Sequence, residues 1–412
     1  MINFKSHRLS NGLKVIVHED HATPLAAVNI LYNVGARDEN PSHTGFAHLF
    51  EHLMFGGSEN VPLFDEPLQQ ASGENNAFTS NDITNYYESL PAINLETAFW
   101  LESDRMNSLN FDDHSLDVQR KVVCEEFKEH YINQPYGDVW HQLRSLAYRQ
   151  HPYQWPTIGK KLEHVEQASL DEVKKFFFRY YRPNNSILVV AGNVKAEDVF
   201  SLAEKWFESI PEGEDFHRQL PVEPVQTEPR SLTLHSNVPL DAIYKAWHMP
   251  GRMDDTYYAA DLLSDILSGG KSSRLYQALV KEKKMFSEVH AYHTGSIDPG
   301  LMVIEGKLVK GVKMEEAENA INEEVIKIKA EIINDQELTK IKNRVESQIA
   351  FSEMEVLNKA MNLAYCELLG NANLVNEEAA YYLNTTAEEI QNIAIEIFRE
   401  SNCSTLYYYS NN

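Results

Sequence analysis

The chain contains two copies of one segment, and this repetition limits the folds that it can adopt. Residues 47–57 read AHLFEHLMFGG and residues 260–270 read ADLLSDILSGG, so alanine, leucine and the closing Gly-Gly recur at one constant offset. Upstream, residues 27–32 match residues 242–247 at nearly the same offset. A self-similar segment in each half of a 412-residue chain indicates a duplicated strand-then-helix unit, and we expect two related domains.

The two copies differ where the first carries histidine. His48 and His52 are four residues apart, which places both imidazoles on one face of a helix, one turn from each other. Glu51 stands beside the second histidine and points toward the same place. The second copy replaces these three residues by Asp261, Ser264 and Asp265. The scaffold therefore does not require the histidines, and two imidazoles so arranged can hold one metal ion.

The order His-x-x-Glu-His is the inverse of the His-Glu-x-x-His helix of zinc proteases. A catalytic zinc takes three protein ligands and keeps a fourth position for water. We expect His48 and His52 to supply two ligands and Glu51 to act as the general base toward the water. Ser42 or Thr44 is expected to cap the helix at its N-terminal end.

Charge and hydropathy exclude several kinds of partner. The chain has 37 basic and 61 acidic residues and a net charge of −24, which argues against nucleic acid and against an anionic membrane surface. It has no apolar run of roughly 18 residues, as a membrane span would need. No signal peptide is visible, so we expect a cytoplasmic protein, or a periplasmic one if a leader was removed. The three cysteines are expected to be unpaired.

Composition also suggests where the domains divide. Prolines among acidic residues, with no apolar period, mark a linker at residues 212–229. We predict an N-terminal domain with the metal site over residues 1–211 and a C-terminal domain without one over residues 230–412.

The sequence resembles the M16 metallopeptidases, the superfamily of pitrilysin, insulysin and the mitochondrial processing peptidase, in its short two-domain bacterial form. The matching segments are residues 35–39, 45–57, 76–79, 119–126, 181–185 and 269–276. The resemblance implies an α+β fold of two homologous domains, each a mainly antiparallel sheet packed with helices. It also implies that the chain assembles with a second subunit as a clamshell around a peptide. The implied activity is zinc-dependent hydrolysis of peptides or unfolded small proteins, with one Zn²⁺ per chain.

The resemblance implies a third zinc ligand at Glu126, in the segment QRKVVCEE at residues 119–126. Its neighbour Glu125 points about 100° away on a helix, so both cannot serve. Gln119 stands where many members carry a glutamate, and we expect it to support the ligands through a hydrogen bond.

Substrate contact is expected at an exposed strand edge formed by Asn76, Ala77 and Phe78. A peptide that adds to such an edge is held by main-chain hydrogen bonds, so many sequences are tolerated. An ordinary internal strand is the alternative interpretation of this segment.

One departure from the family pattern concerns assembly. Active members usually carry an arginine and a tyrosine seven residues apart in the C-terminal half, and Val280 and Ser287 stand at those positions here. We therefore expect a heteromer in which a second M16-like subunit supplies the pair, with a homodimer as the alternative. The alternative function is a non-catalytic M16-like scaffold or assembly subunit, which the presence of all the zinc residues disfavours.

Overall fold

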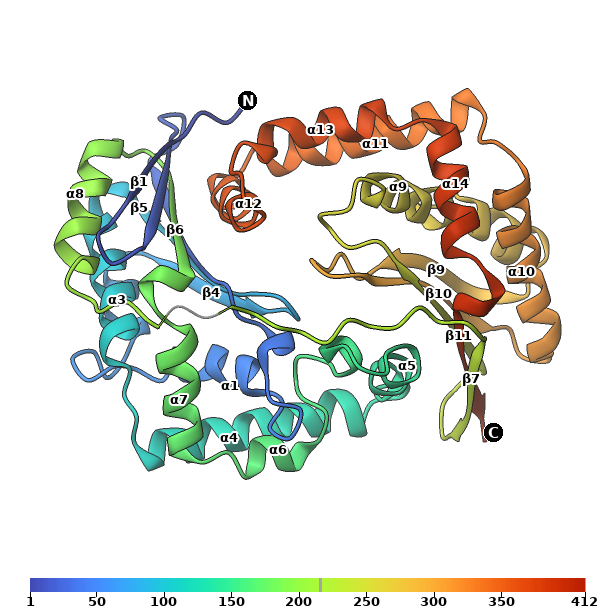
Figure 1. Cartoon of the computed structure of the whole chain (residues 1–412), viewed down its shortest axis with the longest axis horizontal. Coiled ribbons are helices and arrows are strands. Elements are labelled where there is room, and N and C mark those ends of the chain that lie inside the picture. The colour runs from blue at the N-terminus through green and yellow to red at the C-terminus, as the bar shows by residue number, and fades with distance from the viewer. Residues whose placement is uncertain (215–216, 412) are drawn as a thin grey trace. The chain divides into compact units, whose positions relative to one another are not determined.

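Two β-sheets organise the chain, one in each of two units (Figure 1). The computed structural model describes residues 1–214 and 217–411. Unit 1 consists of Met1–Glu129, Trp155–Leu220 and Ala350–Glu377. Unit 2 consists of His130–Gln154, Pro221–Ile349 and Glu378–Asn412.

The sheet of unit 1 has six strands, of which β2 and β6 run parallel and the other neighbours antiparallel. In spatial order the strands are β1 (Lys5–Arg8), β2 (Lys14–Glu19), β6 (Ser186–Gly192), β3 (Leu25–Tyr32), β5 (Thr84–Pro91) and β4 (Glu74–Thr79). The central strands β3 and β6 are almost entirely buried because helices cover both faces. Strand β4 forms one edge of the sheet, and β5 is its single partner among the strands of the described residues.

The helices of unit 1 lie on both sides of its sheet. Helix α12 (Val356–Leu368) packs on β3 and β6, where Ala360, Leu363 and Ala364 contact the apolar core. The opposite side carries α1 (Phe46–Leu53), α2 (Asp65–Gln70), α3 (Leu95–Ser108), α4 (Asp113–Phe127), α6 (Leu162–Glu166), α7 (Leu170–Tyr180) and α8 (Ala196–Phe207).

The sheet of unit 2 has five strands in the same arrangement. Their spatial order is β7 (Arg230–Ser236), β11 (Cys403–Ser410), β8 (Ala242–Met249), β10 (Gly300–Leu308) and β9 (Phe286–His293). Here β7 and β11 run parallel, and the other neighbours run antiparallel. The order and directions match those of β2, β6, β3, β5 and β4 in unit 1. The duplication inferred from the repeated segment therefore extends to the topology of the sheets.

The helices of unit 2 also cover both faces of its sheet. Helix α5 (Val139–Ala147) packs on one face, against β8 and β11. The remaining helices are α9 (Tyr257–Ser268), α10 (Met314–Ala330), α11 (Asp335–Ser352) and α14 (Ala387–Ile397), while α13 (Leu374–Asn384) spans the boundary between the units.

The two units are not the linear halves that the sequence suggested. Residues 130–154, from the N-terminal half, belong to unit 2, and residues 350–377, from the C-terminal half, belong to unit 1. The reason is that each of these segments carries an amphipathic helix, α5 or α12, that buries its apolar side on the other half's sheet. Within the predicted linker, residues 212–214 and 217–229 form neither helix nor strand.

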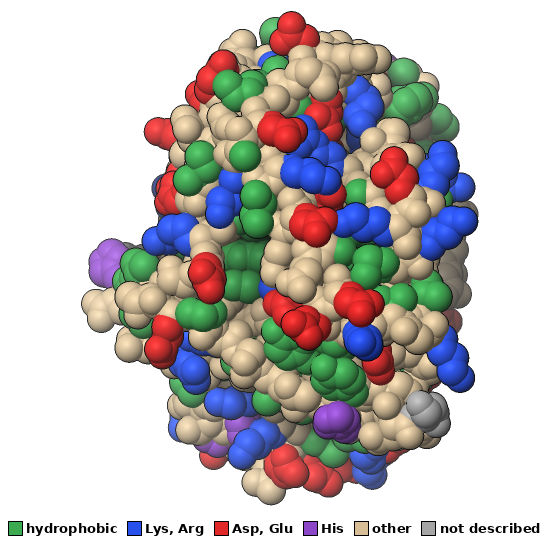
Figure 2. All heavy atoms as spheres, turned by 90° about the vertical axis from the view of Figure 1, so that its right-hand side faces the viewer, with side chains coloured by type: hydrophobic (Ala, Val, Ile, Leu, Met, Phe, Trp, Pro, Cys, Tyr) green, Lys and Arg blue, Asp and Glu red, His purple; other side chains and the backbone are tan. Residues whose placement is uncertain are grey.

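Surface composition can be judged on the face of the molecule shown in Figure 2. Lysine and arginine side chains on this face are interspersed with aspartate and glutamate, so it presents no continuous basic surface. Among the helices formed by the described residues, none is both long and apolar enough to span a membrane.

Candidate metal centre

Helix α1 carries the histidine pair and is anchored by its apolar side. The buried residues of this helix are Phe46, Ala47, Leu49, Phe50 and Leu53. His48, Glu51 and His52 lie on the remaining side and are partly exposed. The predicted helical spacing therefore holds, and the three polar side chains share the face that is not packed against the core.

The N-terminal end of α1 is held by a buried glutamate. The helix starts after Gly45, which has φ +91° and no side chain to cap it. Both carboxylate oxygens of Glu39 instead accept hydrogen bonds, from the Gly45 and Ala47 N–H groups at 2.9 Å each. The Trp155 indole donates to the same carboxylate at 3.1 Å. A carboxylate at this end of a helix also complements the helix dipole.

The predicted cap residues have other partners. Thr44 Oγ1 lies 2.8 Å from His164 Nδ1 and accepts from the Lys160 N–H at 2.7 Å. The prediction that Ser42 or Thr44 caps α1 was therefore wrong, because Glu39 folds back from the preceding turn to take this position. Burial raises the pKa of the Glu39 carboxyl to about 8, while the hydrogen bonds from Ala47, Gly45 and Trp155 lower it.

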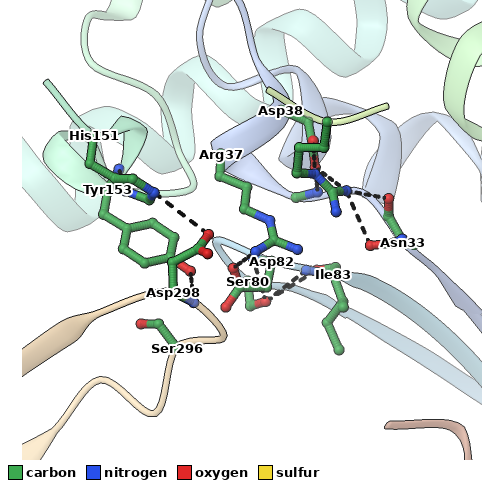
Figure 3. Close-up of polar contacts among 12 residues, drawn as sticks. Asn33, Arg37, Asp38, Ser80, Asp82, Ile83, His151, Tyr153, Ser296 and Asp298 are labelled. Carbon is green, nitrogen blue, oxygen red and sulfur yellow. Dashed lines mark hydrogen bonds and ion pairs between the residues drawn. The ribbon is translucent and has the colours of Figure 1, made fainter. Parts of the chain in front are cut away.

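The segment that contains Glu39 is tied to neighbouring parts of unit 1, as Figure 3 shows. Arg37 forms a buried ion pair with Asp82 at 3.0 Å. Asp38 accepts from Arg218, with a shortest distance of 2.6 Å. These contacts hold the segment at residues 35–39 in place, and so keep the Glu39 carboxylate at the N-terminal end of α1.

Three side chains converge at the exposed side of α1. His48, His52 and Glu126 each offer a ligand atom, and these atoms lie within 4.8 Å of one another. The Glu126 carboxylate lies 3.7 Å from His48 Nε2 and 3.4 Å from His52 Nε2. Glu126 comes from α4, which packs against α1. Two imidazoles and one carboxylate form a donor set that zinc accepts in catalytic sites.

Burial of His48 suits this arrangement. It lowers the pKa of the His48 imidazole, against the opposing effect of Glu126, so the neutral ring that a metal can bind is favoured. Nε2 is the ring nitrogen that faces Glu126, while Nδ1 is buried and has no hydrogen-bond partner among the described residues.

Glu51 points to a different neighbour. Its Oε2 accepts a hydrogen bond of 2.6 Å from the Thr79 hydroxyl, at the end of edge strand β4. No sequence pattern predicted this contact, although Thr79 belongs to the matched segment at residues 76–79.

The structure places Glu125 and Gln119 away from the converging atoms. Glu125 is exposed and pairs with Lys128 at 2.7 Å, as expected for a residue turned away from Glu126 on the same helix. Gln119 lies beside Gly56, three residues after the end of α1. The supporting role of Gln119 stays a prediction.

The predicted substrate segment lies on β4, at the edge of the sheet. Asn76 and Phe78 are exposed, whereas Ala77 and Thr79 are partly buried on the side where α1 packs. The outer backbone groups of β4 pair with no described strand. An edge of this kind can accept an added strand.

In unit 2, the residues that replace the histidine pair make internal contacts. Asp261 accepts from the Tyr382 hydroxyl and lies 2.9 Å from His293 Nε2. Asp265 lies 3.5 Å from Arg344. The same scaffold thus carries a set of paired charges in one unit and a set of converging ligand atoms in the other.

Comparison with known proteins identifies the family and supports the fold. The family model described as Insulinase (Peptidase family M16) matches residues 14–161, and the one described as Peptidase M16 inactive domain matches residues 167–345. The zinc protease PqqE of Helicobacter pylori is 30% identical over 410 residues, covering 98% of this chain and 92% of that protein. The chain therefore belongs to peptidase family M16.

Other relatives extend the comparison. An uncharacterized zinc protease of Bacillus subtilis, YmxG, is 25% identical and covers 99% of both chains. A crystal structure of a protease from Helicobacter pylori has a TM-score of 0.93 at 28% identity, covering 99% of this chain and 100% of that one. A structure from Pseudomonas fluorescens described as a peptidase M16 inactive domain has a TM-score of 0.88 at 15% identity, which shows the shared fold alone. The α+β fold of two related domains predicted from the sequence is confirmed.

The anchoring of α1 by Glu39 can be tested through stability. Glu39→Ala leaves the buried Gly45 and Ala47 N–H groups without an acceptor, each at a cost of about 1–3 kcal/mol, while the Trp155 indole keeps the Ala36 carbonyl, and the variant should have a lower free energy of unfolding in urea. Glu59→Ala removes an exposed carboxylate and is the control, with no expected change. Equal unfolding midpoints for the two variants would contradict the anchoring role.

Proposed function

We propose that this chain is a zinc-dependent endopeptidase that hydrolyses peptides or unfolded small proteins. His48, His52 and Glu126 would hold one Zn²⁺, and Glu51 would be the general base. The observation that carries the proposal is the convergence of three ligand atoms within 4.8 Å, beside a carboxylate on the same helix. Membership of a family whose relatives are named zinc proteases supports it.

The bound zinc would polarise the peptide carbonyl and lower the pKa of its water toward about 7. Glu51, one residue from His52, would take the proton from that water and then protonate the leaving amine. The edge of β4 at Asn76, Ala77 and Phe78 would hold the substrate as an added strand. Main-chain pairing of this kind places the peptide without requiring a particular sequence.

The alternative is a non-catalytic M16-like scaffold. A scaffold needs the packed side of α1 but has no use for converging imidazoles on its exposed side. Unit 2 illustrates this, because Asp261 and Asp265 there are engaged by neighbouring side chains of the same unit. The difference between the two copies favours the peptidase.

The proposed enzyme would be a heteromer. Val280, at the position of the family's arginine, packs against the apolar core of unit 2. Ser287, at the position of the tyrosine, donates to the Lys307 carbonyl at 3.1 Å. Val280 has no donor and the Ser287 hydroxyl is already bonded, so a second M16-like subunit would supply the arginine and the tyrosine. A homodimer with other oxyanion donors is the alternative.

Metal binding distinguishes Glu126 from its neighbour. The wild-type chain should bind one equivalent of Zn²⁺, and Glu126→Gln should weaken that binding because one of three ligands is lost. Glu125→Gln is the matched control, since it changes the adjacent carboxylate, and should bind zinc like the wild type. Isothermal titration with Zn²⁺ measures both, and equal affinities for the two variants would refute the ligand assignment.

Glu51→Gln separates chemistry from metal binding. The amide keeps the shape of the side chain but cannot take a proton, so zinc content should be unchanged while hydrolysis of a quenched peptide falls by roughly 10²–10⁴-fold. Turnover should also disappear when the wild type is treated with a chelator. Full activity in Glu51→Gln would reject the general base, and chelator-resistant activity would reject the zinc enzyme.

The assembly can be tested on the purified single chain. We expect its specific activity to be low and to rise when a second M16-like subunit carrying the arginine and tyrosine is added. Native mass spectrometry of material isolated from the source cells would identify such a subunit. Full specific activity from the single chain, together with a homodimeric mass, would favour the alternative.

A further inference from the structure

Thr79 makes the shortest polar contact described for the proposed base. Its hydroxyl donates to Glu51 Oε2 at 2.6 Å, a length typical of a hydroxyl bound to an ionised carboxylate. A threonine hydroxyl has one proton, so donating it here requires Glu51 to accept. The bond holds one carboxylate oxygen and leaves the other, Oε1, for a different partner.

The position of Thr79 links two parts of the proposed site. Thr79 is the last residue of β4, two residues after Ala77, and both side chains lie on the partly buried side of the strand. Glu51 lies on α1, which packs against β4. One residue therefore belongs to the strand that is proposed to pair with the peptide and contacts the group that is proposed to activate water.

The duplicated unit makes a comparable contact at the same strand position, beside a helix that lacks the histidine pair. Because Ala27 matches Ala242, Ile30 corresponds to Lys245, three residues further on in each strand. In unit 1, Ile30 pairs with Tyr86, and Tyr86 pairs with Ala77 on the edge strand. In unit 2, Lys245 pairs with Ile304, and Ile304 pairs with Ala291, so Ala77 corresponds to Ala291. Thr79 therefore corresponds to His293, two residues beyond Ala291. His293 also contacts the neighbouring helix, with Nε2 at 2.9 Å from Asp261. Each unit therefore has a strand-to-helix contact from the same strand position, but it reaches the position of His48 in unit 2, at Asp261, and the base Glu51 in unit 1.

We propose that Thr79 is a positioning residue that orients Glu51 and couples the edge strand to the base. This inference rests on the proposed peptidase function. By fixing Oε2, the hydroxyl restricts rotation of the carboxylate about its terminal bond, so Oε1 is presented in one direction. Strand β4 then sets the orientation of Glu51. A peptide paired with β4 would be held in a fixed position relative to the Glu51 carboxylate.

The test compares two variants of the full chain. Thr79→Val keeps the shape of the side chain without the hydroxyl, and kcat for a quenched peptide should fall about 10–100-fold at unchanged KM and zinc content. Thr79→Ser keeps the hydroxyl and should restore most of kcat. A kcat equal to that of the wild type in Thr79→Val, or an equally low kcat in both variants, would overturn the proposal.

His293→Phe is the matched control in the duplicated unit. It removes the strand-to-helix contact made from the matching strand position, so the unfolding midpoint should fall while kcat stays within twofold of the wild type. If His293→Phe lowered kcat as much as Thr79→Val, the contact would be a general support of the fold and the proposal would be overturned.

A crystal structure of Thr79→Val decides the positioning role without an activity assay. The Glu51 carboxylate should turn away from its wild-type orientation, and an unchanged orientation would overturn the proposal. The wild-type chain could bind zinc and still show no chelator-sensitive hydrolysis, either by itself or with a second subunit. That result would reject the peptidase function but not the positioning role of Thr79. The crystal structure would then still decide whether Thr79 orients Glu51.

Discussion

The placement of α1 depends on a buried carboxylate at its N-terminal end. Gly45 opens the helix in a left-handed conformation and offers no cap, so Glu39 accepts the free N–H groups instead. Farther along, the buried Tyr86 hydroxyl donates to the Phe50 carbonyl at 3.1 Å, and Arg105 lies over the Tyr86 ring at 4.6 Å. The histidines are therefore carried by a helix bonded to the core, which limits the movement of their imidazoles.

The two units show how one scaffold can carry different chemistry. Both contain five strands in the same order, a helix after the equivalent strand (β3 or β8), and a contact from the edge strand to that helix. In unit 2 the helix presents aspartates whose charges are paired within the unit. In unit 1 it presents imidazoles that meet a carboxylate from α4. Function in this chain lies in a few side chains placed on a shared fold.

Part of this site was predictable because it is local. The spacing of His48 and His52 places them on one helical face whatever surrounds the helix, and the repeated segment predicted a related strand-then-helix unit in each half. Glu126 was inferred only through resemblance, since a distance of more than seventy residues along the chain carries no geometric signal. Glu39 was missed because its bonds to Gly45 and Ala47 depend on the path of the intervening turn, whereas Ser42 and Thr44 stood where a sequence rule places a cap.

By itself the sequence determined the duplication, the helix with two imidazoles on one face, and the difference between the two copies, because each is a pattern of neighbouring residues. The tertiary structure decided which carboxylate faces the histidines, which hydroxyl holds Glu51, and which sheet each of α5 and α12 covers. These outcomes depend on which apolar faces bury one another across the whole chain. Periodicity shows that such faces exist, but it does not show with which partner each one packs.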